Sequence, residues 1–262
     1  MSNVEAVLRP LDEAVTAANM TPLDPTSDGL AEERPRKLAP ANFRAGTSSV
    51  ELDEIRPRSH AGRRQDACRT CEAAALFVDI VGYTRMSEAL SPEDMLEVLE
   101  YFYESMTKVS QLYGGRVERY DGDALFVTFG TRSGDGQIAT AALRCAFEMH
   151  DVVAHWSRKR SSAGQVGIEI GIGIDYGAVA VAKLQICGDS TRALQGDPVN
   201  VARKLEELTR ELGACLAVSD RIVEAAIIEG RSYHLLAQMS EHAPRKIGHR
   251  IAPMGFWSLA NA

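Results

Sequence analysis

The sequence lacks a surplus of positive charge, and it lacks any long run of apolar residues. Its 29 Lys and Arg residues are outnumbered by 36 Asp and Glu residues, which gives a net charge of −7. Bulk electrostatics therefore gives no reason to expect nucleic acid as a partner. No apolar run approaches the length of a membrane span, and the N-terminal residues lack the hydrophobic segment of a signal peptide. We expect a soluble, cytoplasmic protein without a membrane partner.

Cysteines are few, and their number is odd. Only two of the five lie close together, in Cys68-Arg-Thr-Cys71. A single pair of this spacing without a second Cys or His pair is a weak signal for zinc or for redox chemistry. We interpret the thiols as structural or incidental.

The first seventy residues differ in composition from the rest. Val4–Met20 has the pattern of a short amphipathic helix, and the stretch that follows, up to about Asp66, is rich in Pro, Arg, Glu and Ser. Too few apolar residues recur there to build a core, so residues 1–70 are predicted to be a partly disordered tail or a regulatory arm. Residues 71–262 are long enough and apolar enough for one folded domain.

After residue 70 the pattern becomes regular. An apolar run predicts a buried strand at Ala73–Asp79. Ser91, Pro92 and Asp94 form the start signature of a helix, which Gly114–Gly115 ends. The further elements predicted are strands at Arg116–Tyr120 and Ala124–Phe129 around the turn pair Asp121–Gly122, a helix at Ile138–Trp156, a strand pair at Val166–Ile174 and Ala178–Ile186, and a helix at Pro198–Leu212. Helices alternating with a mostly antiparallel sheet define the α+β class.

Two carboxylates stand where strands open into turns. Asp79 ends the first strand and leads into Gly82, and Asp123 follows the predicted hairpin turn. Mg²⁺ in proteins prefers one or two carboxylates together with phosphate oxygens. The pair is therefore predicted to form a two-carboxylate metal site; the alternative is that each residue only ends a strand or a turn.

Four segments, taken in order and spacing, resemble class III nucleotidyl cyclases: Phe77–Thr84, Gly122–Leu125, Gly171–Gly177 and Gly196–Glu206. The resemblance covers roughly residues 72–258. It implies a ferredoxin-like βαββαβ core with a C-terminal extension. Catalysis in the family occurs between two cyclase domains, so the resemblance also implies a head-to-tail homodimer.

The reaction implied is attack of a ribose 3′-hydroxyl on the α-phosphate of a nucleoside triphosphate, giving a 3′,5′-cyclic nucleotide and pyrophosphate. Two divalent ions, Mn²⁺ or Mg²⁺, suit it physically, one lowering the pKa of the hydroxyl and the other neutralising the triphosphate. By resemblance the metal-binding residues are Asp79, Ile80 and Asp123. The backbone that would hold the phosphates comprises Ile80, Val81, Gly82, Tyr83 and Thr84.

The other half of the implied site comes from the second protomer. Asn200 matches the family's ribose-orienting Asn, and Lys204 stands where the family usually places its transition-state Arg. Lys can meet a phosphoryl oxygen as a point charge. Arg203 is the alternative, although one residue turns a helical side chain by about 100°. Lys246 is a candidate γ-phosphate partner, and the alternative is a solvated surface lysine.

The base-reading positions depart from the family pattern. Adenylyl cyclases carry a Lys and an Asp or Thr at the positions that Arg119 and Ala193 occupy here. Ala cannot accept a hydrogen bond from an exocyclic amine, and Arg is donor-only and prefers an edge rich in acceptors. Uracil offers two such acceptors, and Arg119 with Tyr120 nearby would fill the space of a purine. The pattern resembles bacterial pyrimidine cyclases of anti-phage signalling, so UTP is ranked above CTP, with a separate receptor for the cyclic product.

Two other interpretations stay open. One is an adenylate cyclase with an atypical base pocket. The other is a degenerate domain that binds nucleotide or a partner without catalysis, which the Lys at position 204 favours. The presence of Asp79, Asp123 and Asn200 argues against the degenerate domain. A domain that catalyses no reaction has no physical need for two carboxylates that face each other.

Overall fold

A single mixed sheet runs through the chain, with helices on both of its faces. The computed structural model describes residues 68–132, 134, 136–186, 189–248 and 252–261. Its elements, in chain order, are β1 (Cys68–Ile80), α2 (Tyr83–Ala89), α3 (Pro92–Leu112), β2 (Arg116–Asp121), β3 (Ala124–Phe129), α4 (Ile138–Ser162), β4 (Ile170–Ile186), β5 (Asp189–Gln195), α5 (Asp197–Leu212), β6 (Ala214–Ser219), α6 (Asp220–Glu229), α7 (Tyr233–Leu236), β7 (Ser240–Arg245) and β8 (Met254–Ala260). The helix predicted at Val4–Met20 and Cys187 lie outside the described residues.

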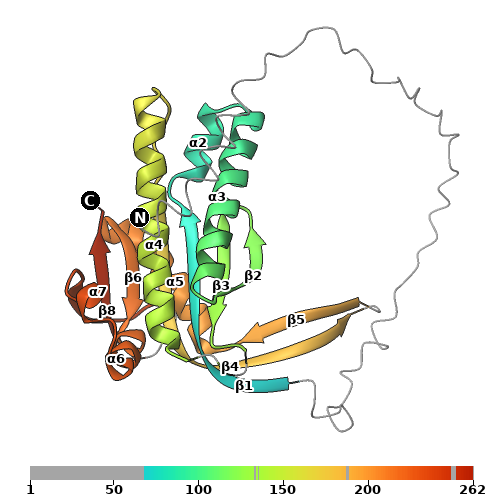
Figure 1. Ribbon diagram of the computed structural model, residues 1–262, viewed down its shortest axis with the longest axis vertical. Coiled ribbons are helices and arrows are strands. Elements are labelled where there is room, and N and C mark those ends of the chain that lie inside the picture. The colour runs from blue at the N-terminus through green and yellow to red at the C-terminus, as the bar shows by residue number, and fades with distance from the viewer. Residues whose placement is uncertain (1–67, 133, 135, 187–188, 249–251, 262) are drawn as a thin grey trace, which may run out of the picture.

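The sheet order confirms the predicted α+β fold. Strands follow one another as β2-β3-β1-β4-β6-β8-β7, and β5 pairs with β4 off this path. The first four of these strands, with α3 and α4 as connections, form the βαββαβ core in the ferredoxin-like order; the elements after β4 form the C-terminal extension. Figure 1 shows β4 and β5 leaving the sheet together as a long hairpin arm beside the start of β1.

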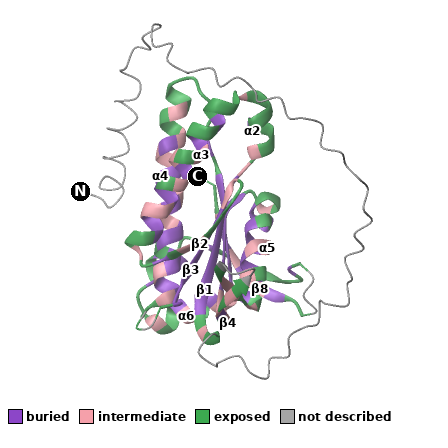
Figure 2. Cartoon of the chain, turned by 90° about the vertical axis from the view of Figure 1, so that its right-hand side faces the viewer, coloured by how far each residue is buried: buried purple, intermediate pink, exposed green. Residues whose placement is uncertain are grey.

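The side chains of β1 point alternately to the two faces of the sheet. Leu76 and Val78 belong to the large core cluster under α3 and α4. Ala75 and Phe77 point to the opposite face, where they pack with Phe126 and with Ala202 of α5. Successive side chains of a strand point to opposite faces, and Figure 2 shows α3 and α4 on one side of the buried strands and α5 on the other. Asp79 therefore shares the α5 face with Phe77.

The capped start of α3 is confirmed. The Ser91 hydroxyl accepts from the Asp94 N–H at 3.1 Å and donates to the Asp94 carboxylate at 2.8 Å. The β2–β3 hairpin is also confirmed, with its turn one residue later than predicted, because Asp121 still pairs with Ala124. Gly122, at φ 66, and Asp123 are the two turn residues, so Asp123 lies outside the pairing of β2 with β3.

The predicted strand pair around residues 175–177 is wrong. One strand, β4, runs unbroken from Ile170 to Ile186, since it pairs with β1 over the whole of that strand, with Gly177 opposite Ala73. The residues between Val166 and Ile170 lie before the strand. The reversal comes after Ile186 and leads into β5, which the sequence analysis did not predict.

The glycines at positions 171 and 173 let α5 approach β4. A Cβ at Gly173 would overlap the Ala202 carbonyl oxygen and the Glu206 backbone nitrogen, and one at Gly171 would lie 2.5 Å from the Thr209 hydroxyl. Close packing of α5 on β4 therefore requires glycine at both positions, and this packing fixes the position of α5 over the sheet.

Gly173→Ala is expected to destabilise the fold strongly. Its new methyl group would meet backbone atoms of α5, and overpacking of this kind costs about 3 kcal/mol or more of unfolding free energy. Gly136→Ala is the matched control, because nothing lies within 4 Å of a Cβ there. Urea unfolding followed by circular dichroism measures both, and equal midpoints would contradict the packing argument.

Cys68 and Cys71 both lie on β1, in extended backbone. Three residues of strand separate them by about 10 Å and place their side chains on opposite faces. This geometry rules out a disulfide or a shared zinc between them.

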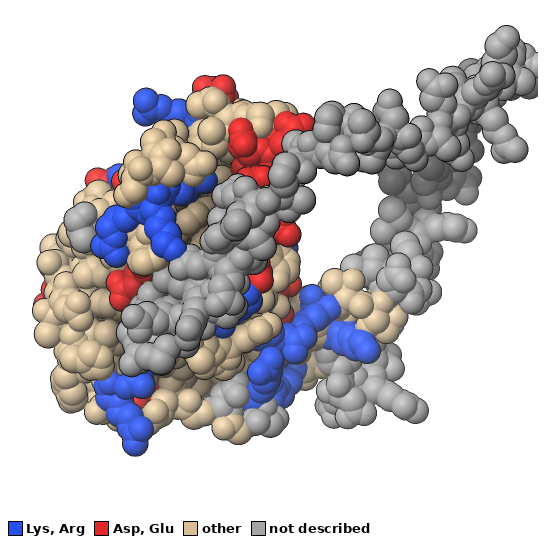
Figure 3. Space-filling model, turned by 45° about the horizontal axis from the view of Figure 1, so that its top comes forward, with Lys and Arg blue, Asp and Glu red and all other residues tan. Residues whose placement is uncertain are grey.

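The surface carries both signs of charge. On the side seen in Figure 3, Lys and Arg side chains form separate patches with acidic residues among them. No helix in the described part of the chain is long and apolar enough to cross a membrane.

Candidate active site

The structure brings Asp79 and Asp123 together at one end of the central strands. Asp79 lies next to the last residue of β1, and the backbone N–H of Ile80 donates to the Asp123 carbonyl at 3.3 Å. Burial, and after it the charge of Asp123, raise the pKa of the Asp79 carboxyl to about 6, although Arg210 opposes the rise. Two carboxylates forced this close repel each other.

The pair fits a divalent cation. Asp79 Oδ1 is buried and has no hydrogen-bond partner among the described residues. A cation would satisfy that oxygen and remove the repulsion with Asp123. Within the described residues no group of three or more His, Cys, Asp and Glu side chains forms a complete ligand set. Two carboxylates suffice for Mg²⁺ when substrate phosphates complete its shell.

Arg210 of α5 also reaches this site, which the sequence analysis missed. Its Nη2 donates to Asp79 Oδ2 at 2.5 Å and lies 3.2 Å from Glu206 Oε1. The four-residue spacing of Glu206 and Arg210 predicts a helical ion pair. Nothing in the sequence placed that pair beside the end of β1.

The predicted phosphate-binding backbone is only partly available. The N–H groups of Ile80 and Val81 already donate to the carbonyls of Asp123 and Glu169. Gly82 adopts φ 74 and turns the chain directly into α2. The prediction is thereby narrowed to the N–H groups of Gly82, Tyr83 and Thr84.

Asn200 and Lys204 lie one turn apart on the same face of α5. Lys204 Nζ donates to the Glu207 carboxylate at 2.7 and 2.9 Å. Within the described part of the chain, neither residue makes a polar contact with Asp79 or Asp123. Neither side chain therefore completes the carboxylate pair of its own chain in this structure.

Lys246 is exposed and follows β7. Its neighbour Ile247 is buried against α5, in a cluster with Val201 and Leu205. A Cβ at Gly248 would lie 3.0 Å from the Lys204 side chain. This segment therefore runs along α5 and ends beside Lys204.

Two arginines lie over a pair of stacked aromatic rings on the α5 face of the sheet. The rings of Phe77 and Phe126 stack at a centroid distance of 4.5 Å. The Arg203 guanidinium lies 4.7 Å from the Phe77 ring, and that of Arg119 lies 6.0 Å from the Phe126 ring. Asp121 Oδ2 joins them, at 3.0 Å from Arg203 and 3.6 Å from Arg119. Arg203 thus belongs with Arg119 and not with Lys204, and Asp121 is a polar partner that the sequence analysis missed.

Two predicted base-site residues face elsewhere. Tyr120 pairs with Leu125 on the α3 side of the sheet, and its hydroxyl lies 3.0 Å from the hydroxyl of Thr107. Arg119 is the neighbour of Tyr120 in β2 and pairs with Phe126, so its side chain points to the other face. The β-bulge between Val117 and Arg119 sets which of the two faces each residue takes. The prediction that Tyr120 shares a pocket with Arg119 is therefore wrong.

Ala193 points away from the aromatic pair. Its neighbour Leu194 packs against the cluster of Phe77 and Phe126, and alternation along β5 puts Ala193 on the opposite side. Arg192 lies on the Leu194 side and binds Glu118. In this chain's own sheet Ala193 therefore does not lie beside Arg119, and its role at the base stays a prediction.

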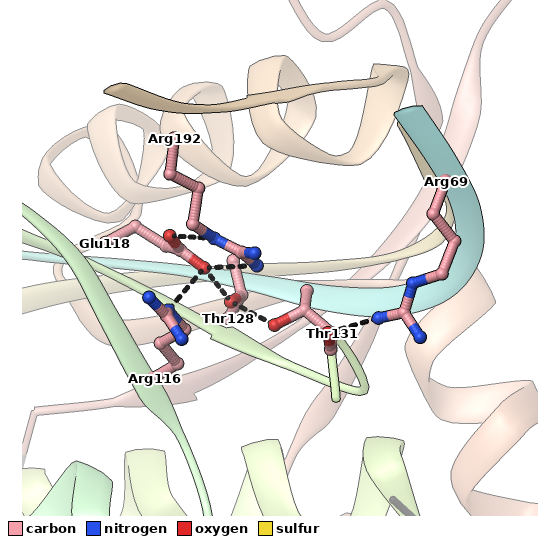
Figure 4. A network of polar contacts seen from close by, with 6 residues as sticks. All are labelled: Arg69, Arg116, Glu118, Thr128, Thr131 and Arg192. Carbon is pink, nitrogen blue, oxygen red and sulfur yellow. Dashed lines mark hydrogen bonds and ion pairs between the residues drawn. The ribbon is translucent and has the colours of Figure 1, made fainter. Parts of the chain in front are cut away.

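Glu118, the bulged residue, forms the centre of a polar network (Figure 4). Arg192 holds its carboxylate with two contacts of 2.9 and 3.1 Å, and the Thr128 hydroxyl donates at 2.7 Å. The side chain of Glu118 is only 8% exposed. Since Arg192 lies on β5 and Glu118 on β2, the network fixes the β4–β5 arm against the sheet.

A βαββαβ sheet with paired carboxylates at the end of its first strand is the arrangement that the resemblance to nucleotidyl cyclases implies. Comparison with known sequences agrees. Residues 66–241 match the model of the adenylate and guanylate cyclase catalytic domain, and the chain belongs to that family. An adenylate cyclase of Anabaena cylindrica is 31% identical over 176 residues, which cover 66% of this chain and 34% of that protein. Adenylate cyclase 1 of Rhizobium meliloti is 26% identical over 152 residues, or 58% of this chain and 23% of that protein.

Solved structures share the fold. The adenylyl cyclase CyaB from P. aeruginosa superposes with a TM-score of 0.63 at 21% identity, covering 74% of this chain and 96% of that one. The guanylyl cyclase Cya2 superposes with a TM-score of 0.61 at 24% identity, covering 73% and 93%. The chain spans about a third or less of the length of the two curated relatives named above.

Proposed function

We propose that the protein converts a nucleoside triphosphate, with UTP preferred, into its 3′,5′-cyclic monophosphate and pyrophosphate. The half-buried pair of Asp79 and Asp123 is the observation that carries the reaction class. These two residues, with the backbone of Ile80, would hold two divalent ions, Mn²⁺ or Mg²⁺. The ions would supply charge neutralisation at the triphosphate and a lowered pKa of the 3′-hydroxyl.

The other catalytic groups are proposed to come from a second copy of the chain. Asn200 is exposed and Lys204 is partly exposed on α5, and neither makes a polar contact with Asp79 or Asp123 among the described residues. In a head-to-tail homodimer, Asn200 would orient the ribose and Lys204 would meet a phosphoryl oxygen as a point charge. Lys246, whose segment runs to Lys204, would add positive charge near the terminal phosphate. Gly82, Tyr83 and Thr84 would donate backbone N–H groups to phosphate oxygens of the other half-site.

The base preference rests on the paired arginines. Arg119 and Arg203 carry only hydrogen-bond donors, and their guanidinium groups lie over the buried rings of Phe77 and Phe126. Asp121 holds both guanidinium groups in place. The acceptors O2 and O4 of uracil match two donor groups, whereas a base that leaves donors unpaired in a closed pocket is penalised.

An adenylate cyclase is the second candidate, because the relatives named above are adenylate cyclases. In that case adenine would have to be read through its ring nitrogens, which are acceptors. The proposed cyclic product, cyclic UMP or cyclic AMP, would act through a separate receptor. A role in anti-phage signalling is part of the UTP proposal and follows only from the resemblance to pyrimidine cyclases.

Product analysis separates the candidates. Purified protein is incubated with ATP, GTP, CTP or UTP and Mn²⁺, and products are identified by chromatography and mass spectrometry. We expect cyclic UMP as the main product, by about tenfold or more over the other bases. The Asp79→Asn variant, purified in parallel, controls for a contaminating cyclase. Cyclic AMP as the main product would leave the metal site intact and overturn the base assignment.

A further inference from the structure

The guanidinium of Arg210 lies where the metal site needs positive charge. It donates to Asp79 Oδ2 and lies 3.2 Å from Glu206 Oε1. Burial lowers the pKa of Arg210, and the carboxylates of Glu206, Asp79 and Asp123 together outweigh this effect and raise it. Three acidic side chains therefore act on one cation, and two of them form the proposed metal site.

The Glu206 carboxylate can accept a further hydrogen bond. Its side chain is only 7% exposed, and its Oε1 has no hydrogen-bond partner among the described residues. Burial is the main cause that raises its pKa to about 7, and Arg210 opposes that rise. A buried acceptor without a hydrogen bond costs free energy, so a stronger contact with Arg210 would be favourable.

Glu206 and Arg210 differ in how far their side chains can move. Glu206 is fixed, since its backbone packs against Gly173 so closely that no Cβ fits between them. Arg210 has a side chain that is 41% exposed, so its long chain can shift without disturbing the core. Movement of the guanidinium from Asp79 to Glu206 needs no movement of α5.

We propose that Arg210 is an internal counter-cation of the metal site, which neutralises Asp79 in the metal-free protein and passes to Glu206 when a divalent ion binds. The proposal rests on the metal site of the proposed function. Arg210 and Glu206 are positioning residues in this scheme, because neither binds the metal or the substrate. While no metal is bound, Arg210 holds in place two carboxylates that repel each other. When a metal binds, Glu206 accepts the guanidinium, so the guanidinium does not have to move into water.

The proposal predicts opposite effects of two isosteric or nearly isosteric changes. Arg210→Gln removes the competing cation, so Mn²⁺ should bind about three- to tenfold more tightly. Glu206→Gln removes the charged acceptor for Arg210, so Mn²⁺ should bind about threefold or more weakly. In the double variant, the weakening of Mn²⁺ binding by Glu206→Gln should largely disappear, because no guanidinium is left to be transferred.

Titration of the full chain with Mn²⁺, followed by the electron paramagnetic resonance signal of the free ion, measures these affinities without relying on activity. Arg210→Lys keeps the charge and should stay close to the wild type. Arg245→Gln is the matched control: Arg245 pairs with Glu211 of the same helix at 2.9 Å, both are exposed, and the proposed site is not involved. Thermal unfolding confirms that each variant is folded.

Four results would overturn the proposal. Weaker Mn²⁺ binding by Arg210→Gln would mean that Arg210 orients Asp79 for the metal. Full additivity in the double variant would mean that Glu206 acts on the metal only through its charge. No Mn²⁺ binding by the wild type would refute the metal site and the counter-cation together. Normal binding that Asp79→Asn abolishes, with no effect of either change at Arg210 or Glu206, would refute the counter-cation alone.

Discussion

Asp79→Asn is expected to reduce cyclic nucleotide formation by about 10³-fold or more. The amide cannot replace the charged ligand, and the loss of metal assistance costs several kcal/mol of transition-state stabilisation. The fold should survive, because Asn removes the repulsion with Asp123 and keeps the size of the side chain. Initial rates with Mn²⁺ and each nucleoside triphosphate measure the effect.

The matched control is Asp151→Asn. Asp151 is an aspartate on α4 whose side chain is 63% exposed, and its change should leave the rate unaltered. If Asp79→Asn retained full activity, Asp79 would not be a metal ligand.

Mixing variants tests the shared site as part of the same experiment. Asp79→Asn and Asn200→Ala damage opposite halves of a head-to-tail site, so each alone should be inactive. In a mixture, half of the dimers would carry both variants and keep one intact site, which restores about a quarter of wild-type activity. No recovery after subunit exchange would show that both residues act within one chain.

Arg221→Ala is expected to lower the free energy of unfolding by about 3–5 kcal/mol. Arg221 holds Asp175 of β4, whose side chain has no solvent exposure, through its Nε at 3.0 Å and through Nη2. Burial raises the pKa of Asp175 in spite of this arginine. Removal of the arginine leaves a buried charge without its partner, which is strongly destabilising. Urea unfolding measures the loss.

Two further variants test the reason for this loss. Arg245→Ala breaks the exposed pair of Arg245 and Glu211 and should cost about 1 kcal/mol or less. Asp175→Asn, placed in the Arg221→Ala background, should recover part of the stability, because no charge is then buried. Equal losses for Arg221→Ala and Arg245→Ala would contradict the argument.

The same arginine connects stability to the proposed active site. Arg221 Nη1 lies 3.0 Å from Asp197 Oδ2 at the first residue of α5, three residues before Asn200. Asp175 belongs to the segment whose predicted turn the structure replaces by continuous strand. The buried Asp175 needs an arginine from α6, which is a contact between distant elements. Local turn propensity therefore could not predict it.

The sequence by itself determined the local features. The Ser91 cap, the apolar run of β1 and the Asp121–Gly122 signal depend on residues close in the chain, and the structure reproduces the helix, the strand and the hairpin that they predict. The carboxylate pair was also readable, because Asp79 ends a strand and Asp123 follows a hairpin turn, and the pattern predicted the position of both. The resemblance of four segments to nucleotidyl cyclases then implied the βαββαβ fold.

Only the tertiary structure decided which face each side chain takes and what lies against it. A single bulged residue, Glu118, puts Arg119 and Tyr120 on faces that a regular count along β2 does not give. Strand β4 continues through residues 175–177 because β1 pairs with it throughout, and that pairing is not local. Arg210 reaches Asp79 because α5 packs closely on Gly173, across more than a hundred residues of sequence. Such contacts depend on the packing of distant elements, so no pattern within one segment contains them.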